Sequence, residues 1–377
     1  LPPGVLTTDL KAITTDPDID IVVELLGGLE PSRSLILEAI KNGKHIVTAN
    51  KAVIARHGDE IFMAADEAGV YVMIEGAVGG GIPVISPLQQ SLGANRIERI
   101  IGIVNGTTNY ILTEMTQKGA DFADVLANAQ ELGYAEADPT ADVDGWDAAD
   151  KIAILASLGF GGRIERERIP CEGIRKISAV DIDYAKRLNF IIKLLAIAER
   201  KPEGGLLVRV HPTLVPNDHP LGGINGVFNA ILVEGEPLGQ VMFFGPGAGA
   251  GPTASAVVAD LLNIVALIKQ GKTSSLHSLL NSSHQNYCVL EPEGELETRF
   301  YARFLTKDLA GVIGTLGTSF GEHGVSLESV VQTGFQGNLA EIIVVTHDVK
   351  AGDFATALEG IAQFDAVEEI ASVIKVL

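Results

Sequence analysis

The sequence predicts a chain of mixed α/β and α+β class, with a partial Rossmann-type domain, a central α+β domain and a ferredoxin-like βαββαβ domain. Two observations predict this. Buried strands alternate with helices over about the first eighty residues, which is typical of parallel βαβ units. About the last eighty residues follow strand-helix-strand-strand-helix-strand order, which is the split βαβ order. We therefore expect domains at 1–82, 83–272 and 298–377, with a linker at 273–297.

The first region contains three strand candidates and two helix candidates. Residues 19–26 form an almost continuous apolar run that ends at Gly27-Gly28, as expected of a strand that is buried on both faces. The elements that follow are, in order, helix 35–40, strand 45–48, helix 59–68 and strand 70–74. In open parallel sheets, ligands bind beyond the carboxyl ends of the strands. The segments in that place are Gly27-Gly28, residues 48–51 and residues 75–81.

The glycine pattern of this region is incomplete for a nucleotide-binding sheet. No G-x-G-x-x-G segment follows a strand here, and three strands are too few for a doubly wound sheet. We therefore expect residues 1–82 to be the C-terminal half of a dinucleotide-binding domain whose first half lies upstream of residue 1. Residues 1–4 have neither the basic start nor the apolar run of a signal peptide.

The central region mixes strands and helices less regularly. Strands are expected at 96–104, 206–211 and 228–233. Helices are expected at 105–118, 122–132, 147–158, 183–199 and 253–269, the last of them packing back on the first domain. A polar, acidic linker follows. The final region should contain strands 299–305, 327–333, 340–346 and 367–376, with helices 311–323 and 353–363.

The composition narrows the possible functions. The net charge is −20, so the surface would repel DNA or RNA. Cys171 and Cys288 have no paired spacing, which argues against a disulfide scaffold or a zinc site and fits a reducing, cytoplasmic environment. The most apolar stretch, 254–268, is interrupted by Asp260 and Asn263. We expect a buried helix there rather than a membrane span.

An acidic segment surrounds a single lysine. Its six acidic residues lie within the sixteen residues that end at Lys151: Glu136, Asp138, Asp142, Asp144, Asp147 and Asp150. Asp147 and Lys151 are four residues apart, so on a helix they share one face. A solvated loop leading into an ordinary salt bridge would explain the same residues. Residues 142–145 also suggest part of a calcium loop, although the remaining ligand spacing of an EF-hand is missing.

Two segments at the expected carboxyl ends of strands could also carry chemistry. Lys51 follows the strand at 45–48 and so faces the ligand crevice, or else it is an ordinary surface lysine. The glycines of residues 75–83 could simply form a tight turn. They also leave backbone carbonyls uncovered, which suits a hard, oxygen-seeking cation.

Together these segments resemble a known family much more specifically than any one of them does. The motifs are VTANK, EGAVGGGIP, GIVNGTTNYILTEM, LGYAEADPTADVDGWDAADK and GPGAGAGPTA. They occur in the order and spacing found in homoserine dehydrogenases, from about Val5 to Lys269. Residues 83–272 would then be the catalytic and dimerisation domain. The C-terminal domain resembles an ACT domain, a small amino-acid-sensing module.

This family interconverts aspartate 4-semialdehyde and homoserine by hydride exchange with NAD(P)H, so the resemblance implies an NADP- or NAD-dependent oxidoreductase. Lys151 matches the catalytic lysine that protonates the aldehyde oxygen. Lys51 matches a lysine at the junction of cofactor and substrate that assists proton transfer, and each lysine should lower the other's pKa. Glu136 and Asp147 match residues that hold the substrate's amino group, with Asp142 beside them.

The resemblance also implies cofactor and cation sites. Gly133 and Gly249 match glycines that approach the nicotinamide, and Thr48, Asn50 and Lys51 lie along the cofactor. The loop whose carbonyl oxygens bind Na⁺ or K⁺ is matched by Glu75, Val78, Gly80 and Ile82. The family's pyrophosphate-binding fingerprint is not within these 377 residues, so we expect them alone to bind NAD(P)H weakly.

The expected partners follow from the same resemblance. They are the substrate, a regulatory amino acid (threonine first) at residues 307–312, and further copies of the chain in a homodimer or homotetramer. Neither nucleic acid nor a membrane is expected, and the implied pathways make threonine, methionine and isoleucine. Two alternatives stay open. One is a different amino-acid dehydrogenase, against which Glu136, Asp147 and Lys151 argue, and the other is a non-catalytic amino-acid sensor on a degenerate dehydrogenase scaffold.

Overall fold

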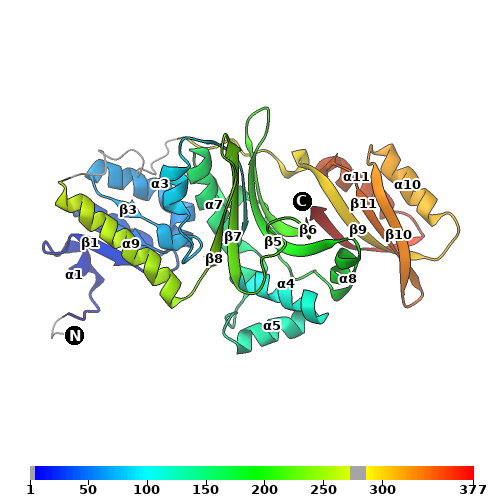
Figure 1. The fold of residues 1–377 in the computed structure, drawn as a ribbon, viewed down its shortest axis with the longest axis horizontal. Coiled ribbons are helices and arrows are strands. Elements are labelled where there is room, and N and C mark those ends of the chain that lie inside the picture. Colours follow the sequence, from blue (N-terminus) through cyan, green and yellow to red (C-terminus); the bar gives the residue numbers. More distant parts are fainter. Residues whose placement is uncertain (1–4, 272–285) are drawn as a thin grey trace.

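A three-stranded parallel sheet forms one end of the molecule (Figure 1). The computed structural model describes residues 5–271 and 286–377. The strands lie in the order β1 (Ile21–Glu24), β2 (His45–Thr48) and β3 (Val72–Met73). The helices of this end are α1 (Leu10–Thr15), α2 (Ser32–Lys41) and α3 (Lys51–Ala68). The predicted parallel β-α-β arrangement is therefore confirmed.

Helix α9 (Ala250–Lys269) returns to this sheet from far along the chain and crosses in front of it in Figure 1. Val257 and Ile264 are buried with Val47 of β2. The helix is long and apolar enough to cross a membrane by length and composition alone. In this structure it packs on the sheet instead, and Leu262 on its other face is exposed. The prediction of a buried helix holds for one face only.

The centre of the molecule is a large sheet that continues into the C-terminal part. Its strand order is β10-β11-β9-β13-β6-β5-β4-β7-β8, with β12 paired to β9. The central strands are β4 (Arg96–Ile103), β5 (Phe190–Arg200), β6 (Leu206–Pro216), β7 (Phe228–Glu236) and β8 (Gly239–Pro246). The central helices are α4 (Gly106–Lys118), α5 (Phe122–Glu131), α6 (Thr140–Val143), α7 (Trp146–Phe160) and α8 (Ala179–Arg187). Helices α4, α7 and α8 pack on these strands.

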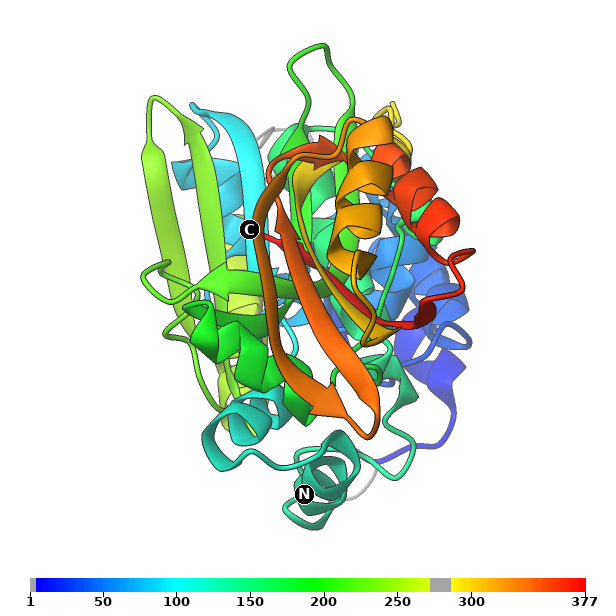
Figure 2. The ribbon, with the colours of Figure 1, turned by 90° about the vertical axis from the view of Figure 1, so that its right-hand side faces the viewer.

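The C-terminal part has the predicted βαββαβ order. Its elements are β9 (Glu297–Lys307), α10 (Val312–Glu322), β10 (Leu327–Gln336), β11 (Leu339–Thr346), β12 (Val349–Lys350), α11 (Ala351–Ile361) and β13 (Val367–Val376). The long strands are antiparallel in the order β10-β11-β9-β13, which is the ferredoxin-like arrangement. Successive residues of β9 face opposite ways. Phe304 is buried in the core beneath α10 and α11, whereas Arg303 binds Asp181 of α8. Figure 2 shows α10 and α11 together on one side of the C-terminal strands.

The C-terminal and central strands are joined by a short parallel pairing between β13 and β6, in which Lys375 lies opposite Thr213. Residues 286–296 belong to the predicted linker, yet they run along the central part. The N–H of Leu206 donates to the carbonyl of Val289 at 2.8 Å. The earlier part of the predicted linker lies outside the described residues. The C-terminal part, which we call the C-terminal module, is therefore attached to the central part by a shared sheet as well as by its connecting segment.

The predicted helix at 183–199 is wrong. Helix α8 ends at Arg187 and β5 begins at Phe190. Asn189, between them, has a left-handed backbone with a φ of 65°, a conformation that asparagine tolerates better than most residues. The apolar run that follows continues as a buried strand. Periodicity alone does not separate a buried strand from a buried helix in such a run.

Candidate active site

Lys51, Asp147 and Lys151 meet between the three-stranded sheet and the central sheet. Lys51 is the first residue of α3 and directly follows its N-cap, Asn50. Asp147 and Lys151 lie one turn apart on α7. The Nζ of Lys51 is 2.9 Å from Oδ1 of Asp147, and the Nζ of Lys151 is 2.7 Å from Oδ2. One carboxylate therefore holds two ammonium groups from different parts of the chain.

The two lysines differ in their surroundings. Lys151 is buried and donates a second hydrogen bond, of 2.7 Å, to the carbonyl of Val104 just after β4. An ammonium has three N–H bonds, so these two contacts leave one N–H for a ligand. The side chain of Lys51 is 41% exposed. The site therefore combines a buried, oriented ammonium with one that solvent reaches.

The charges in this cluster stabilise one another. Burial disfavours the charged form of Asp147, but Lys151 and Lys51 overcome that effect and hold the pKa of the Asp147 carboxyl below its ordinary value. Asp147 in turn raises the pKa of Lys51. The pKa of Lys51 is thus raised overall, because the carboxylate of Asp147 lies between the two ammonium groups and outweighs any lowering by the second lysine.

Asn105 links the two aspartates of the site, and sequence reasoning missed it. Its Nδ2 donates to Oδ1 of Asp142 at 2.7 Å and to Oδ2 of Asp147 at 2.9 Å. Its Oδ1 accepts from the N–H of Thr108 and so caps α4. Burial raises the pKa of Asp142. The available signal was an asparagine between a strand and a helix, where an N-cap is expected.

Glu136 is not part of this cluster in the structure. It is exposed, in the loop between α5 and α6. Among the described residues, its backbone carbonyl accepts a hydrogen bond from Gln130 at 3.0 Å, while its carboxylate has no hydrogen bond or ion pair. Gly133 opens the same loop with a φ of 74°. The loop therefore brings Glu136 near α5 without fixing its carboxylate.

A crevice of about 440 Å³ lies at the carboxyl ends of β1 and β2, where α9 begins. Most residues that line it are small or apolar: Leu25, Gly27, Ala49, Asn50, Ala250, Thr253, Ala254, Val257 and Val258. Gly249, the N-cap of α9, borders this lining with a φ of 122°. Small residues allow a ligand to approach the backbone closely. Open parallel sheets bind dinucleotides in this position.

Thr48 supports this crevice from inside the protein. It is fully buried, and its hydroxyl donates to Oε2 of Glu24 at 2.6 Å. Glu24, the last residue of β1, also accepts from the hydroxyl of Ser32 at 3.0 Å and from the N–H of Leu26 at 2.8 Å. Sequence reasoning missed Glu24. The signal was an acidic residue with two apolar residues on each side within the run 19–26, which indicates a buried, hydrogen-bonded carboxylate.

The carboxylate of Glu75 accepts hydrogen bonds from residues that follow its loop. It accepts from the N–H groups of Val84, Ile85 and Ser86 at 2.7, 2.8 and 2.9 Å. The hydroxyl of Ser86 donates a fourth hydrogen bond of 2.6 Å. These contacts use the acceptor capacity of both oxygens. Only the backbone carbonyl of Glu75 is left as a ligand for a cation.

The rest of this loop packs tightly against the start of α9. A side chain at Gly80 would place its Cβ 2.7 Å from the carbonyl oxygen of Gly247. Within residues 5–271 and 286–377, no group of three or more His, Cys, Asp or Glu side chains could hold a metal ion. Cys171 and Cys288 are both free. A cation in this loop would therefore be bound by backbone oxygens.

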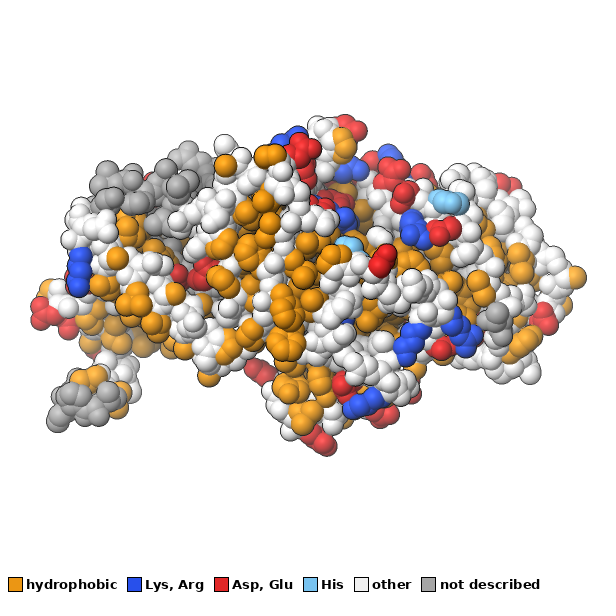
Figure 3. Space-filling view, in the orientation of Figure 1, with side chains coloured by type: hydrophobic (Ala, Val, Ile, Leu, Met, Phe, Trp, Pro, Cys, Tyr) orange, Lys and Arg blue, Asp and Glu red, His pale blue; other side chains and the backbone are white. Residues whose placement is uncertain are grey.

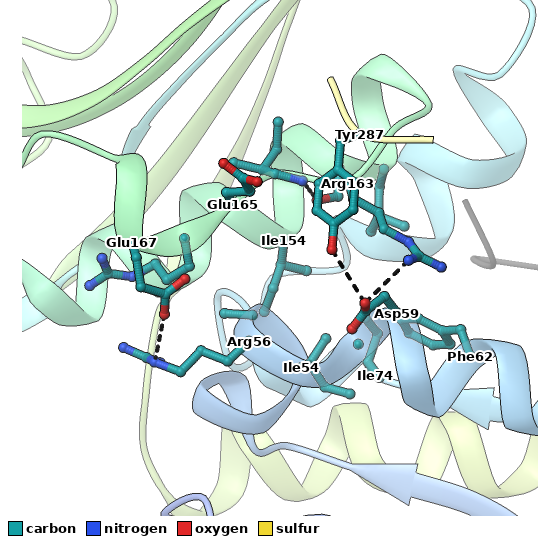
Figure 4. Close-up of a pocket in the computed structure, with 16 residues that line it drawn as sticks. Ile54, Arg56, Asp59, Phe62, Ile74, Ile154, Arg163, Glu165, Glu167 and Tyr287 are labelled. Carbon is teal, nitrogen blue, oxygen red and sulfur yellow. Dashed lines mark hydrogen bonds and ion pairs between the residues drawn. The ribbon is translucent and has the colours of Figure 1, made fainter. Parts of the chain in front are cut away.

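Polar contacts hold α3 against α7 and against the segments around it, and Figure 4 shows those that border one pocket. Asp150 lies 3.0 Å from Arg56 of α3. Farther along α3, Arg163, just beyond the end of α7, and Tyr287 both point toward Asp59, at 3.2 and 3.4 Å. A pocket of about 130 Å³ lies between these pairs. Both ends of the α3–α7 contact are thus held by charge.

Known proteins resemble the chain over nearly its whole length. The family model of the homoserine dehydrogenase NAD-binding domain matches residues 1–75, and the homoserine dehydrogenase model matches residues 83–262. The homoserine dehydrogenase of Synechocystis sp. is 66% identical over 381 residues, covering 100% of this chain and 88% of that protein. That of Bacillus subtilis is 40% identical, covering 100% and 86%.

Solved structures agree with these similarities. A homoserine dehydrogenase from Thiobacillus denitrificans has a TM-score of 0.94 at 42% identity, covering 99% of this chain and 85% of that one. A hyperthermophilic archaeal homoserine dehydrogenase in complex with NADPH has a TM-score of 0.61 at 29% identity, covering 69% and 76%. The non-catalytic sensor and the other amino-acid dehydrogenases are therefore set aside. With its NAD-binding and catalytic regions both matched, the chain belongs to the homoserine dehydrogenase family, the NAD(P)-dependent oxidoreductases that interconvert aspartate 4-semialdehyde and homoserine.

Proposed function

We propose that Lys151 donates the proton to the aldehyde oxygen of aspartate 4-semialdehyde, and accepts it back from homoserine in the reverse reaction. The observation that carries this proposal is the buried Nζ of Lys151, held at 2.7 Å by both Asp147 and the carbonyl of Val104. These contacts orient the third N–H toward a ligand. A cation there stabilises the negative charge that develops on oxygen as hydride reaches carbon.

Lys51 acts beside Lys151 as a second ammonium group. The other oxygen of Asp147 holds it at 2.9 Å, and that carboxylate raises its pKa. The aldehyde oxygen thus reacts in a doubly cationic environment. Because Lys51 is the more exposed lysine, it is the one that exchanges protons with solvent.

The substrate's ammonium group is bound by Asp142, with a weaker contact from the exposed Glu136. Asp147 has both oxygens engaged by lysines, so it organises the proton donors. Asp142 has one oxygen bonded to Asn105, and burial raises its pKa. A bound ammonium would lower that pKa and stabilise the charged carboxylate. This proposal moves the main ammonium contact predicted for Asp147 to Asp142.

The residues that line the crevice above β1 and β2, beside Lys51, would hold the NAD(P)H cofactor. Asn50 lines this crevice, and the other lining residues are small enough for the backbone to approach a dinucleotide. When bound, NAD(P)H supplies the hydride. Gly133 and Gly249 both have positive φ angles, and the absence of side chains there keeps the approach to the substrate open.

Replacing Lys151 by arginine tests the proposed acid. Lys151→Arg keeps the positive charge, but a guanidinium does not give up its proton. We expect kcat to fall by roughly 10²–10⁴-fold, the usual contribution of a general acid, while KM changes by less than about threefold. Lys51→Arg is the matched control and should keep kcat within about tenfold. A larger loss in Lys51→Arg than in Lys151→Arg would assign the acid to Lys51.

The loop that follows β3 is proposed to bind a monovalent cation, Na⁺ or K⁺, through the carbonyl oxygens of Glu75, Val78, Gly80 and Ile82. The engaged carboxylate of Glu75 and the close packing at Gly80 support a rigid ring of carbonyls. Unfolding temperatures in sodium, potassium and choline chloride at equal ionic strength test this site. Equal temperatures in all three salts would argue against it.

Residues 298–377 are proposed to be an ACT domain that senses an amino acid, with threonine as the first candidate. A cavity of about 180 Å³ is lined by Lys307, Asp308, Leu309, Gly311 and Val312 of the turn before α10. No side chain caps α10. Its first N–H groups can therefore receive a carboxylate.

Calorimetry with threonine, methionine, isoleucine and lysine tests this turn. Gly311 has a φ of 93°, so Gly311→Val would strain the turn and should weaken binding by tenfold or more. Gly317→Ala lies on the same helix with open space around it and should bind normally. If none of the four amino acids gives binding heat with the parent enzyme, only a structural role remains for residues 298–377.

We also propose that the chain forms a homodimer through β7 and β8. Hydrophobic side chains gather over β7 and β8 in Figure 3, where Phe228, Met242 and Phe244 are exposed. Such a patch is typical of a protein interface. Phe244→Glu should shift sedimentation to the monomer, whereas Leu132→Glu, also at an exposed apolar residue, should not.

A further inference from the structure

A polar cavity of about 390 Å³ lies at the seam between the central strands and the C-terminal module. Arg99, Glu199 and Arg209 contribute to one wall, from β4, β5 and β6. Arg299 and Lys375 contribute to the other, from β9 and β13. The cavity shares no lining residue with the cavity at the turn before α10. We call it the seam cavity.

The inner wall of the seam cavity has more positive than negative charge. Arg209 is only 5% exposed, and its Nη1 lies 2.9 Å from Oε1 of Glu199. The other oxygen of Glu199 lies 3.3 Å from the Nε of Arg99, an ion pair in which that buried Nε makes no hydrogen bond. Two guanidinium groups thus share one carboxylate. An incompletely paired buried cation favours the binding of an anion.

His211 and Arg299 complete the polar lining next to these groups. Burial, and then Lys375 and Arg209, hold the pKa of His211 well below its ordinary value. His211 is therefore neutral and faces the Nε of Arg209 at 3.2 Å. On the opposite wall, the Nε of Arg299 is buried without a hydrogen-bond partner in the part of the chain that the structure describes. Arg299 also pairs with Glu328, and the Nε of Arg209 donates to His211. A ligand's carboxylate would therefore bind the remaining N–H groups of Arg99 and Arg209.

The charge changes sign toward the mouth of the seam cavity. Lys375 pairs with Glu293 at 3.1 Å, so its charge is compensated. Glu297 and Asp348 line the cavity and are exposed to solvent. The cavity therefore presents guanidinium groups at depth and carboxylates at its rim.

We propose that the seam cavity binds a small α-amino acid, with its carboxylate against Arg209 and Arg99 and its ammonium toward Glu297 and Asp348. A zwitterion matches both signs of charge, whereas a simple carboxylate would be repelled at the rim. The volume is sufficient for a small metabolite. Arg99 lies on β4, the strand that leads to Val104 and so to the proposed proton donor. This site is additional to the one proposed at the turn before α10.

Calorimetry on the Gly311→Val enzyme tests the seam cavity apart from that turn. The probes are L-threonine, L-methionine, L-isoleucine, L-lysine, L-aspartate and L-alanine. We expect saturable binding of at least one of them, and Arg209→Met in the same background should weaken it by tenfold or more, about the effect of one charged hydrogen bond. Heat that persists in Arg209→Met overturns the proposal. The proposal is also overturned if the parent enzyme gives binding heat and the Gly311→Val enzyme gives none. Only the site at the turn before α10 then remains.

A second variant guards against a folding defect in Arg209→Met. Asp348 is exposed at the rim, so Asp348→Lys should leave the unfolding temperature unchanged. It should weaken binding of the same amino acid about three- to tenfold by repelling its ammonium group. Glu322→Lys makes the same charge change on exposed α10, outside the seam cavity, and should bind normally. Equal affinity in both variants, or no heat from any probe, overturns the proposal.

Discussion

Two ionic clusters of opposite composition join the parts of this molecule. In the first, the single carboxylate of Asp147 holds two lysines and connects α3 to α7. In the second, the single guanidinium of Arg303 holds two carboxylates and connects the C-terminal module to α8. Its Nε is 2.8 Å from Asp181, and its Nη1 is 3.2 Å from Glu341. Each cluster is the charge inverse of the other.

The two clusters differ in whether their cationic side chains can give up a proton. Arg303, Asp181 and Glu341 are all less than a tenth exposed. Burial opposes the charge of Arg303, but Asp181 and Glu341 raise its pKa above the ordinary value, and a guanidinium keeps its proton. Lys51, by contrast, is open to solvent, and an ammonium can donate. A buried ionic cluster can therefore serve proton transfer only where one member can lose a proton and reach an opening.

Removing the proton donor of the first cluster should have the largest effect. Lys151→Ala should lower kcat by roughly 10²–10⁴-fold, with KM much less affected, as measured by steady-state kinetics in both directions. Lys44 is the matched control, because it is also buried and donates to the carbonyl of Ile19 at 2.8 Å. Lys44→Ala should cost stability without lowering kcat more than about twofold. Near-normal kcat in Lys151→Ala would transfer the role to Lys51.

Breaking the second cluster should affect stability rather than chemistry. Arg303→Ala leaves the buried carboxylates of Asp181 and Glu341 without their cation, which typically costs about 3–5 kcal/mol. Chemical unfolding measures this loss, and kcat of the folded fraction should stay within about threefold. Arg187→Ala is the control, because Arg187 forms an exposed ion pair with Asp183 on the same helix. A kcat loss as large as that of Lys151→Ala would show that the clusters are not separate in function.

The two clusters were not equally visible in the sequence. Asp147 and Lys151 are four residues apart on a predicted helix, so a local rule related them. Lys51 follows a predicted strand end, and only the family resemblance placed it beside Lys151. Asp181 and Arg303 lie on α8 and β9, with no local pattern to relate them. Only the packing of the C-terminal module on α8 makes that contact.

The elements of the fold show the same distinction between features with a local sequence signal and features without one. The parallel β-α-β order and the βαββαβ order were predicted because glycines and apolar periods mark each element. The strand at Phe190–Arg200 was missed because its apolar run also fits a helix. The pairing of Lys375 with Thr213 could not be predicted, since strand pairing between distant segments depends on tertiary packing. Contacts within an element or at its ends were therefore predictable, and contacts between distant elements were not.

Neutralising the shared carboxylate should change the titration of the first cluster. Asp147 raises the pKa of Lys51, so in Asp147→Asn that pKa should fall and Lys51 should lose its proton at lower pH. NMR of lysine labelled at its ε-carbon measures this titration, and the basic limb of kcat/KM should move in the same direction. Asp144→Asn is the control, because Asp144 pairs with Arg175 instead. An unchanged Lys51 titration would mean that Asp147 is not the cause.

The smallest effect is expected at Glu136, whose carboxylate is exposed and unattached among the described residues. An ion pair in water is worth little, so Glu136→Ala should raise KM about two- to fivefold with little change in kcat. Asp142→Asn removes a partly buried contact and should raise KM about tenfold or more. Glu131→Ala, at an exposed residue at the end of α5, is the matched control. If Glu136→Ala raised KM more than Asp142→Asn, the loop between α5 and α6 would have to close over the substrate and bury Glu136. Exposure in the free enzyme would then be a poor guide to the strength of an ionic contact at this site.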